Sequence, residues 1–214
     1  MVDLHLSDDE QAERLKAWWK ENGTSVIIGA LIGIGIIVGL NFWREYKTSQ
    51  AESASGFYEN MLANYRDKNM DLAAGVGEKV MGNYSSTPYA GKAALLLAKI
   101  KFEENDLATA KSHLRWAMDN AIEAATRHAA RLRLARIFFA EKEYDQASAL
   151  IVVDDYGGFR SEYKELQGDI HMARGETVEA RDAYQAALED LPKGSSYGEI
   201  LQIKADNAVV DINQ

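Results

Sequence analysis

The most distinctive feature of the hydrophobic pattern is a long, nearly uninterrupted apolar run close to the N-terminus. No charged side chain occurs from Asn22 to Trp43, and the 18 residues 26–43 are almost continuously apolar. A helix of that length is about 27 Å long, which is close to the hydrocarbon thickness of a bilayer. A helix in the core of a soluble domain would keep a polar stripe, and this run keeps none. The pattern predicts a single membrane-spanning helix over residues 24–43.

The residues before the run favour a permanent anchor over a cleaved signal peptide. Residues 1–21 carry six acidic and three basic side chains, whereas a signal peptide starts with basic residues and has a shorter apolar region. Aromatic residues, which favour the headgroup region of a bilayer, flank the run on both sides. They are Trp18, Trp19, Trp43 and Tyr46.

The tail before the run, residues 1–23, is predicted to carry a short amphipathic helix. Residues 7–10, Ser-Asp-Asp-Glu, fit a capping box, and Asn22-Gly23 is a typical helix end. The tail holds three Lys or Arg residues, and the first twenty residues after the run hold two. This small excess slightly favours a cytoplasmic N-terminus but does not decide the orientation.

Residues 44–214 are predicted to form an all-α domain. Ala, Leu, Glu, Lys and Arg dominate this region, and no long alternation of apolar and polar residues indicates a sheet. The region contains 27 acidic and 21 basic residues, which argues against nucleic acid as a partner. The chain has no cysteine, and this excludes disulfides and thiolate metal sites.

A helical repeat is visible in this region. The segments "LAKIKFEENDLATAKSHLRWAM", "LARIFFAEKEYDQASALIVV" and "QGDIHMARGETVEARDAYQAAL" align at offsets of 37 and 33 residues. Each has a small residue followed twelve positions later by an alanine, with an acidic residue between them that is expected to begin the second helix. Small residues at these positions let two helices approach closely. They are Ala98 and Ala110, Ala135 and Ala147, and Gly168 and Ala180.

The spacing predicts a solenoid of tetratricopeptide-like helix pairs. An irregular helical bundle is the alternative that the pattern leaves open. The predicted repeats lie near residues 56–87, 88–124, 125–157 and 158–192, the first of them atypical, and residues 196–214 are expected to form a capping helix.

With this layout, the chain resembles the YfgM family, the ancillary subunits of the bacterial SecYEG translocon. The resemblance covers essentially the whole chain: an acidic tail entering "LKAWWKENG", one glycine-rich span, tetratricopeptide-like repeats and the closing "LQIKADNAV". The tail motif, from Leu15 to Gly23, is the most specific element. In the closing segment Ile203, Ala205 and Asn207 depart from the pattern of the family.

The resemblance implies a single-pass protein of the bacterial inner membrane, anchored in the lipid bilayer. It implies a cytoplasmic N-terminus, and it places residues 44–214 in the periplasm. The partners it implies are SecYEG, the membrane-anchored chaperone PpiD and unfolded secretory clients. The implied function is to hand these clients to periplasmic chaperones.

No catalytic or metal-binding motif is visible, and no cofactor is expected. The four histidines, His5, His113, His128 and His171, are far apart in the sequence and lack metal-ligand spacing. The chain contains no Walker loop, no G-x-S-x-G motif and no cysteine nucleophile. This predicts a non-enzymatic binding protein, with a helical active site of unknown type as the alternative.

Four glycines in the predicted span are candidates for docking on a partner helix. They form two G-x-x-x-G pairs that project within an arc of about 160° at 100° per residue. The alternative is that glycine is simply common in membrane helices. The four residues are Gly29, Gly33, Gly35 and Gly39.

One face of the repeat domain is a candidate surface for clients or partners. In this repeat fold the first helix of each pair lines a concave wall. Positions three before, one after and four after the small residue share a face of that helix. Such a wall could accept an unfolded segment by burying its side chains, and methionine adapts to varied shapes. The alternative is that the apolar members are core, since first helices lie between neighbouring helices. The three rows are Leu95, Lys99 and Phe102; Leu132, Arg136 and Phe139; and Glu165, Asp169 and Met172.

Three functions fit these features. The first is a translocon-associated chaperone adaptor, the second a regulatory protein that titrates an envelope-stress partner, and the third a scaffold for envelope assembly. The repeats alone do not separate them, because the fold supplies a groove and not a reaction. The tail motif favours the first.

Overall fold

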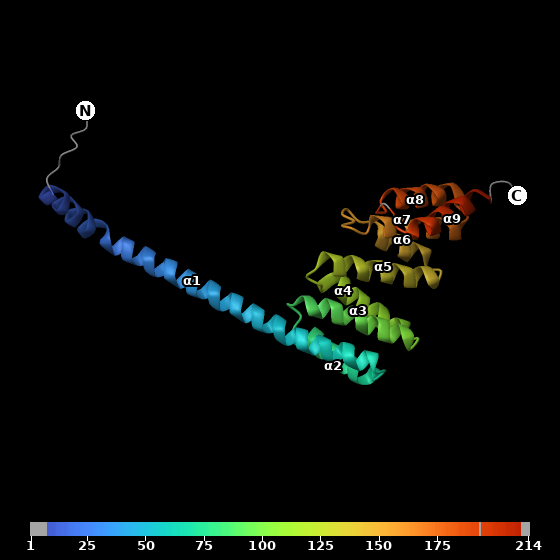
Figure 1. Ribbon diagram of the computed structural model, residues 1–214, viewed down its shortest axis with the longest axis horizontal. Coiled ribbons are helices and arrows are strands. Elements are labelled where there is room, and N and C mark those ends of the chain that lie inside the picture. The colour runs from blue at the N-terminus through green and yellow to red at the C-terminus, as the bar shows by residue number, and fades with distance from the viewer. Residues whose placement is uncertain (1–7, 193, 211–214) are drawn as a thin grey trace, which may run out of the picture. The chain divides into compact units, whose positions relative to one another are not determined.

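The computed structural model describes residues 8–192 and 194–210. Throughout these residues the secondary structure is α-helical, without β-strands, which confirms the predicted all-α fold (Figure 1). The chain divides into two compact units, residues 1–49 and 50–214, and the helix α1 (Asp8–Arg66) runs through the boundary. The other helices are α2 (Met70–Asn83), α3 (Pro88–Glu103), α4 (Leu107–Asn120), α5 (Ala124–Ala140), α6 (Tyr144–Ile151), α7 (Arg160–Arg174), α8 (Thr177–Glu189) and α9 (Tyr197–Val210).

Helix α1 is not interrupted at Asn22-Gly23, and the predicted end of the tail helix is therefore wrong. The side-chain amide of Asn22 donates a hydrogen bond of 3.0 Å to the carbonyl of Trp18 within the helix. The ring of Trp19 covers Gly23 so closely that a Cβ there would lie 3.2 Å from it. A glycine inside a helix costs about 1 kcal/mol relative to alanine, too little to stop this one. The predicted capping box begins at a residue outside the described part of the chain.

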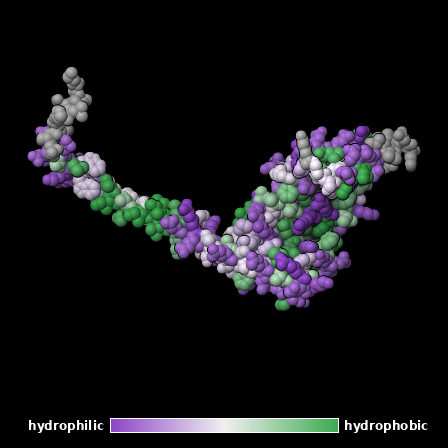
Figure 2. All heavy atoms as spheres, in the orientation of Figure 1, coloured by the Kyte–Doolittle hydropathy of each residue, from purple (hydrophilic) through white to green (hydrophobic). Residues whose placement is uncertain are grey.

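The apolar run lies in the middle of α1, where it forms a continuous apolar band in Figure 2. Among the described residues, α1 is the one helix long and apolar enough to cross a membrane. Its most apolar window has a mean hydropathy of 2.3 and is not buried by other parts of the chain. Since these side chains have no protein cover, they require another apolar environment. The helix is accordingly a candidate membrane span.

The unit of residues 50–214 is a stack of helix pairs. The end of α1 pairs with α2, and then come the pairs α3–α4, α5–α6 and α7–α8, after which α9 packs on α8. The first helices of successive pairs also touch, α3 with α5 and α5 with α7. This is the arrangement in which each repeat buries its apolar face on its neighbours.

The same turn joins the two helices of every pair. One residue in each turn has a left-handed φ, between 61° and 78°. The next residue donates its backbone N–H to the carbonyl five positions earlier, at 2.8–2.9 Å, as in a Schellman motif. The left-handed residues are Lys68, Asn105, Lys142 and Gly175. Lys68, Asn105 and Lys142 are each 37 residues apart. The repeat offset of 37 residues therefore also includes the first pair, although the small residues of that pair follow no clear pattern.

The six small residues of the repeat pattern are all buried where two helices of a pair meet. Gly168 shows why size matters there, because a Cβ at this position would lie 2.5 Å from the ring of Tyr184. The positions equivalent to Tyr184 in the two preceding repeats hold the smaller Leu114 and Ile151, opposite Ala98 and Ala135. The larger facing side chain therefore requires the smaller residue.

Candidate partner-binding groove and membrane anchor

The glycine face of α1 is open. A Cβ added at Gly29, Gly33, Gly35 or Gly39 would meet no atom within 4 Å in the described part of the chain. The aromatic residues at the ends of the run are also available, since Trp18, Trp19 and Trp43 are about half exposed. The ammonium group of Lys47 lies 4.1 Å from the centre of the Trp43 ring, a cation–π contact. A helix partner or lipid can reach this surface without any rearrangement of the chain.

A groove of about 320 Å³ lies between α3 and α5 in the repeat domain. Its floor is apolar, and the large Phe102 at its edge is 55% exposed. In Figure 2 apolar and strongly polar side chains lie together on the face of the repeat domain between α3 and the C-terminal helices. The residues of the floor are Leu95, Ala98 and Phe102 of α3, Leu114 of α4, and Ile137 and Ala140 of α5.

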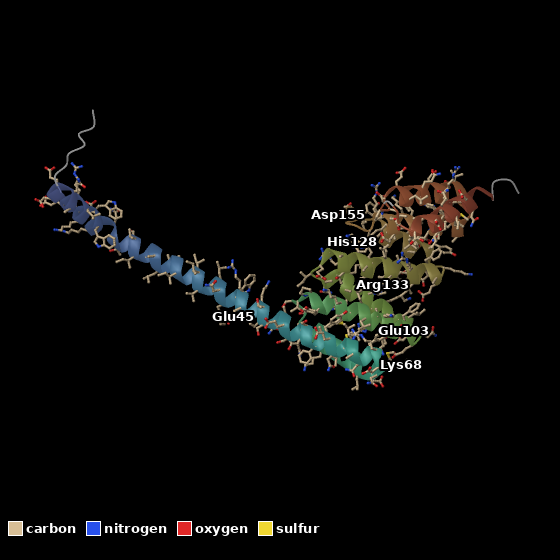
Figure 3. The ribbon with its side chains drawn as sticks, viewed as in Figure 1. Glu45, Lys68, Glu103, His128, Arg133 and Asp155 are labelled. Atoms are coloured by element: carbon tan, nitrogen blue, oxygen red, sulfur yellow. The ribbon has the colours of Figure 1, made fainter. Side chains whose placement is uncertain are left out.

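Three cations stand around this floor, Lys99 on α3 and Arg133 and Arg136 on α5. The ammonium group of Lys99 lies 3.8 Å from the carboxylate of Glu103. The pKa of Lys99 is raised, mainly by a side-chain hydrogen bond with Tyr65, while the positive charge of Arg133 acts in the opposite direction. Figure 3 labels Arg133 on α5 and Glu103 at the end of α3. The groove thus combines an apolar floor with a positive rim.

The first predicted row lies in this groove, but the second lies there only in part. Leu95, Lys99 and Phe102 all line it, and so does Arg136. The prediction is wrong for Leu132, which is 3% exposed in the core, and for Phe139, which packs against that core and against Tyr144.

The physical reason is the direction in which the helices face. A groove between two helices takes from each helix the side that faces the other, so the two helices need not line it with the same set of equivalent positions. The lining side of α5 is therefore shifted by one residue, about 100° around the helix, to Arg133, Arg136, Ile137 and Ala140. Their spacing of three, four and seven residues could have been read from the sequence, but not which side of α5 faces α3.

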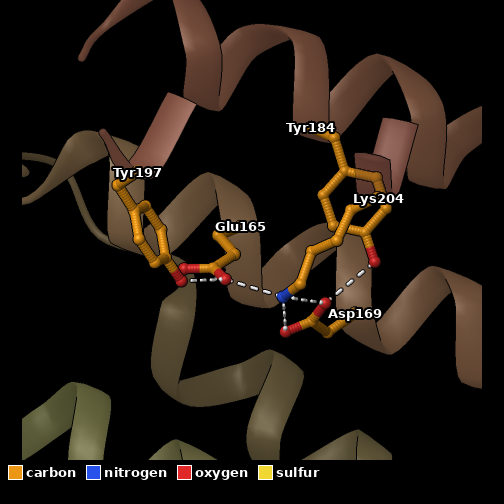
Figure 4. Close-up of polar contacts among 5 residues, drawn as sticks. All are labelled: Glu165, Asp169, Tyr184, Tyr197 and Lys204. Carbon is orange, nitrogen blue, oxygen red and sulfur yellow. Dashed lines mark hydrogen bonds and ion pairs between the residues drawn. The ribbon is translucent and has the colours of Figure 1, made fainter. Parts of the chain in front are cut away.

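The third predicted row is covered by α9. Met172 packs into the cluster formed by α8 and α9 and does not line the groove, so this prediction is also wrong. Glu165 is only 5% exposed. The ammonium group of Lys204, on α9, lies 2.6 Å from a carboxylate oxygen of Glu165 and 2.8 Å from one of Asp169 (Figure 4).

Two tyrosines complete this polar network. The hydroxyl of Tyr197 donates to Glu165 at 2.6 Å, and that of Tyr184 donates to Asp169 at 2.8 Å (Figure 4). Burial alone would lower the pKa of Lys204, but its hydrogen bonds with Asp169 and Glu165 outweigh this effect and the pKa is raised. Burial, together with the hydrogen bond to Glu165, raises the pKa of Tyr197. Lys204 therefore stays charged at neutral pH, and the network holds α9 on α7.

Within residues 8–192 and 194–210 no group of three or more His, Asp or Glu side chains is placed to hold a metal ion. His113 is buried, and its Nε2 lies 3.5 Å from the carboxylate of Glu78 without a hydrogen bond. Burial lowers the pKa of His113, so this histidine is neutral at pH 7.

Comparison with known proteins relates both the anchor and the repeats to one group. The chain is 29% identical over 202 residues to an ancillary SecYEG translocon subunit of Aggregatibacter actinomycetemcomitans, a match that covers 94% of this chain and 98% of the relative. It is 27% identical to the corresponding protein of Haemophilus influenzae, covering 86% of this chain and 90% of the relative. For the protein of Escherichia coli K12 the identity is 25%, over 96% of this chain and 98% of the relative.

These relatives confirm the resemblance inferred from the tail motif and the repeats. Residues 16–210 in addition match the family of the tetratricopeptide repeat-like domain. The match includes the four helix pairs, α9 and most of α1. The chain therefore belongs to the tetratricopeptide repeat-like domain family.

Proposed function

We propose that this chain is a non-enzymatic, membrane-anchored adaptor of the SecYEG translocon that helps to pass newly secreted proteins to periplasmic chaperones. The observation that carries the proposal is the extent of the similarity. Relatives named as ancillary SecYEG translocon subunits match between 86% and 96% of the chain, anchor and repeats together. A match limited to the repeats would support only a protein-binding fold, since such repeats serve many functions.

In the proposed topology residues 1–21 are cytoplasmic, α1 crosses the inner membrane near residues 26–43, and residues 44–214 are periplasmic. The length of the apolar run and the exposed aromatic residues at its ends support the crossing. Protease added to spheroplasts should digest the repeat domain and leave the tail protected. Protection of the repeat domain instead would reverse the orientation.

In the same proposal the glycine face of α1 docks on a translocon helix, and the repeat domain contacts PpiD and emerging secretory chains. The open glycine face supports the first contact, because close helix packing in membranes uses small residues. The exposed groove between α3 and α5 supports the second, because it offers apolar and charged groups together.

Photo-crosslinking of the full chain in cells tests these contacts. A photoreactive amino acid at Gly35 should capture subunits of SecYEG. Ile34, which at 100° per residue points away from the middle of the glycine face, is the matched control and should capture less. The same probe at Phe102 should capture PpiD or secretory chains.

Two outcomes would contradict the proposal. One is that neither Gly35 nor Ile34 captures a translocon subunit in cells that contain the chain at its natural level. The other is that Phe102 captures a regulator of the envelope-stress response and no chaperone or client, which would favour the regulatory alternative.

A further inference from the structure

The groove between α3 and α5 carries positive charge on both of its walls. Lys99 projects from α3, and Arg133 and Arg136 project from α5. Lys99 has an acidic neighbour on its own helix, but within the described part of the chain neither arginine has a hydrogen bond or an ion pair. Like charges that face each other across a gap repel. The two walls therefore lack the attraction that would draw them together.

The junction between α7 and α9 shows how the same fold closes such a gap. Helix α9 packs on α8 as α5 packs on α4. At the positions equivalent to Leu95 and Lys99 stand Glu165 and Asp169, and Lys204 reaches both acids from α9. Here opposite charges meet, and the junction is filled by side chains of the chain itself. In the α3–α5 groove no acidic side chain of the described residues pairs with Arg133 or Arg136.

We infer that the α3–α5 groove binds a short acidic segment of another protein. One leucine- or phenylalanine-like side chain of this segment enters between Leu95, Phe102 and Ile137. Its flanking carboxylates pair with Arg133 and Arg136, since guanidinium groups bind carboxylates with two parallel hydrogen bonds. The inference deepens the proposed function. It rests on that function only for the identity of the protein that carries the acidic segment, a translocon partner or a secretory client.

The size and shape of the groove favour a polypeptide. A volume of about 320 Å³ is at the low end of ligand cavities, which suits a few side chains. Arg133 and Arg136 lie one turn apart on α5, about 5–6 Å between their Cβ atoms, a separation that neighbouring carboxylates of a peptide can match. A lipid headgroup could pair with the arginines, but it has no small apolar group for the floor.

The test uses the full chain in phosphatidylcholine nanodiscs and a short fluorescent peptide. The probe has one central phenylalanine flanked by aspartates in a glycine–serine background. Two matched probes replace the aspartates by lysines or the phenylalanine by serine. We expect the acidic probe to bind at least about tenfold more tightly than either, since each change removes charge pairing or the apolar anchor.

Variants of the groove sharpen the test. Arg133→Glu combined with Arg136→Glu should reverse the preference, so that the lysine probe binds better than the aspartate probe. Phe102→Ser should weaken binding of both the aspartate probe and the lysine probe. Arg181→Glu, which changes an exposed arginine on α8, is the matched control and should leave binding unchanged. All of these side chains are exposed, and unchanged melting temperatures are expected; if the double variant does not fold, Arg133→Gln alone should weaken the acidic probe several-fold.

Four results would overturn the inference. The aspartate and lysine probes could bind equally well, or the double variant could bind as the native chain does. Phosphatidylglycerol vesicles could displace the probe completely, which would make the occupant a lipid. Self-association of the chain could be abolished by Arg133→Glu, which would make it a second copy. If crosslinking at Gly35 is lost while the probe still binds, only the assignment to the translocon is wrong. If crosslinking at Gly35 persists while the probe does not bind, only the inference of an acidic segment is wrong.

Discussion

The α3–α5 and α7–α9 junctions occupy corresponding places in the stack of helix pairs, but the first is an open groove and the second is closed by ion pairs. In the first, Leu95, Lys99 and Phe102 of α3 border an open groove whose other wall is also positive. In the second, Glu165 and Asp169 of α7 are paired with a lysine from α9. In each, a helix packs on the second helix of the preceding pair, α5 on α4 and α9 on α8. The two junctions differ in the charges that their side chains bring together.

The comparison shows how a repeat protein separates stability from binding. The closed junction ends the stack, because a terminal repeat would otherwise leave its apolar face uncovered. The open junction keeps two arginines, Arg133 and Arg136, that have no hydrogen bond or ion pair in the described part of the chain, beside the exposed Phe102. Such groups are characteristic of binding surfaces. One position of the repeat thus serves folding in the last helix pair and is free to serve recognition in an earlier one.

The largest effect is expected from Ala147→Arg, which tests the repeat register on which the comparison depends. Ala147 is fully buried between α5 and α6. An arginine there would bury an unpaired charge and overpack the contact, at a cost of about 3–5 kcal/mol of unfolding free energy. Thermal melting of the full chain in detergent, followed by circular dichroism, measures this loss.

Ala149→Arg is the matched control for this change, since Ala149 is exposed on the same helix. It should melt as the native chain does. If both variants melted alike, the assigned register of the repeats would be wrong.

A smaller effect is expected from Lys204→Met, which opens the closed junction. The substitution keeps the length of the side chain but leaves the carboxylate of Glu165 buried without its cation. Because Lys204 is 30% exposed and water can partly compensate, we expect a loss of about 2 kcal/mol. Melting of the full chain measures it, together with faster proteolysis of α9.

Combining Lys204→Met with Glu165→Gln should restore part of the lost stability, because the unpaired charge is then removed. Gln202→Met, at an exposed position of α9, is the control. Equal melting temperatures for Lys204→Met and Gln202→Met would show that the network does not hold the cap.

The turns within the repeats offer a test of about 1 kcal/mol. Lys142 has a φ of 64°, which is unfavourable for a residue with a Cβ, whereas the equivalent Gly175 adopts 78° without strain. Lys142→Gly should stabilise the chain by about 0.5–1 kcal/mol, and Gly175→Lys should destabilise it by about 1 kcal/mol. If both changes raised, or both lowered, the free energy of unfolding, Lys142 and Gly175 would not occupy the same position of a shared turn.

The smallest effect concerns pH. Burial lowers the pKa of His113, partly opposed by Glu78 and Asp106 and reinforced by Lys101. The unfolded chain therefore binds the proton more tightly, and the free energy of unfolding falls as the pH drops below about 6.5. Between about pH 7.5 and about pH 5.5 the free energy of unfolding should fall more for the native chain than for His113→Gln. Parallel pH curves would show that the histidine does not contribute, and Lys204, whose pKa is raised, should cause no change in this range.

Features that depend on local pattern were predictable from the sequence. The anchor follows from an uninterrupted apolar run, because a bilayer sets the required length. The helix pairs follow from small residues at a fixed spacing, because close helix contacts exclude larger side chains. The first pair was predicted only as an atypical repeat near residues 56–87, because its small residues follow no clear pattern; its turn residue, Lys68, does not mark a left-handed turn in the sequence.

Local pattern failed where competing local signals meet. Asn22-Gly23 has the composition of a helix end, yet α1 continues through it because Trp19 covers the glycine and the apolar run follows. The expected membrane docking of the four glycines stays a prediction, since it depends on a partner and not on this chain.

The sequence by itself determined the anchor, the repeat frame and the supply of apolar and charged groups on the first helix of each pair. The tertiary structure alone decided which of these groups meet. Periodicity defines the faces of a helix, but the stacking of successive pairs decides which face is turned toward a neighbour. This is why Arg133 and Ile137 line the groove in place of Leu132 and Phe139, and why α9 covers the row that ends at Met172.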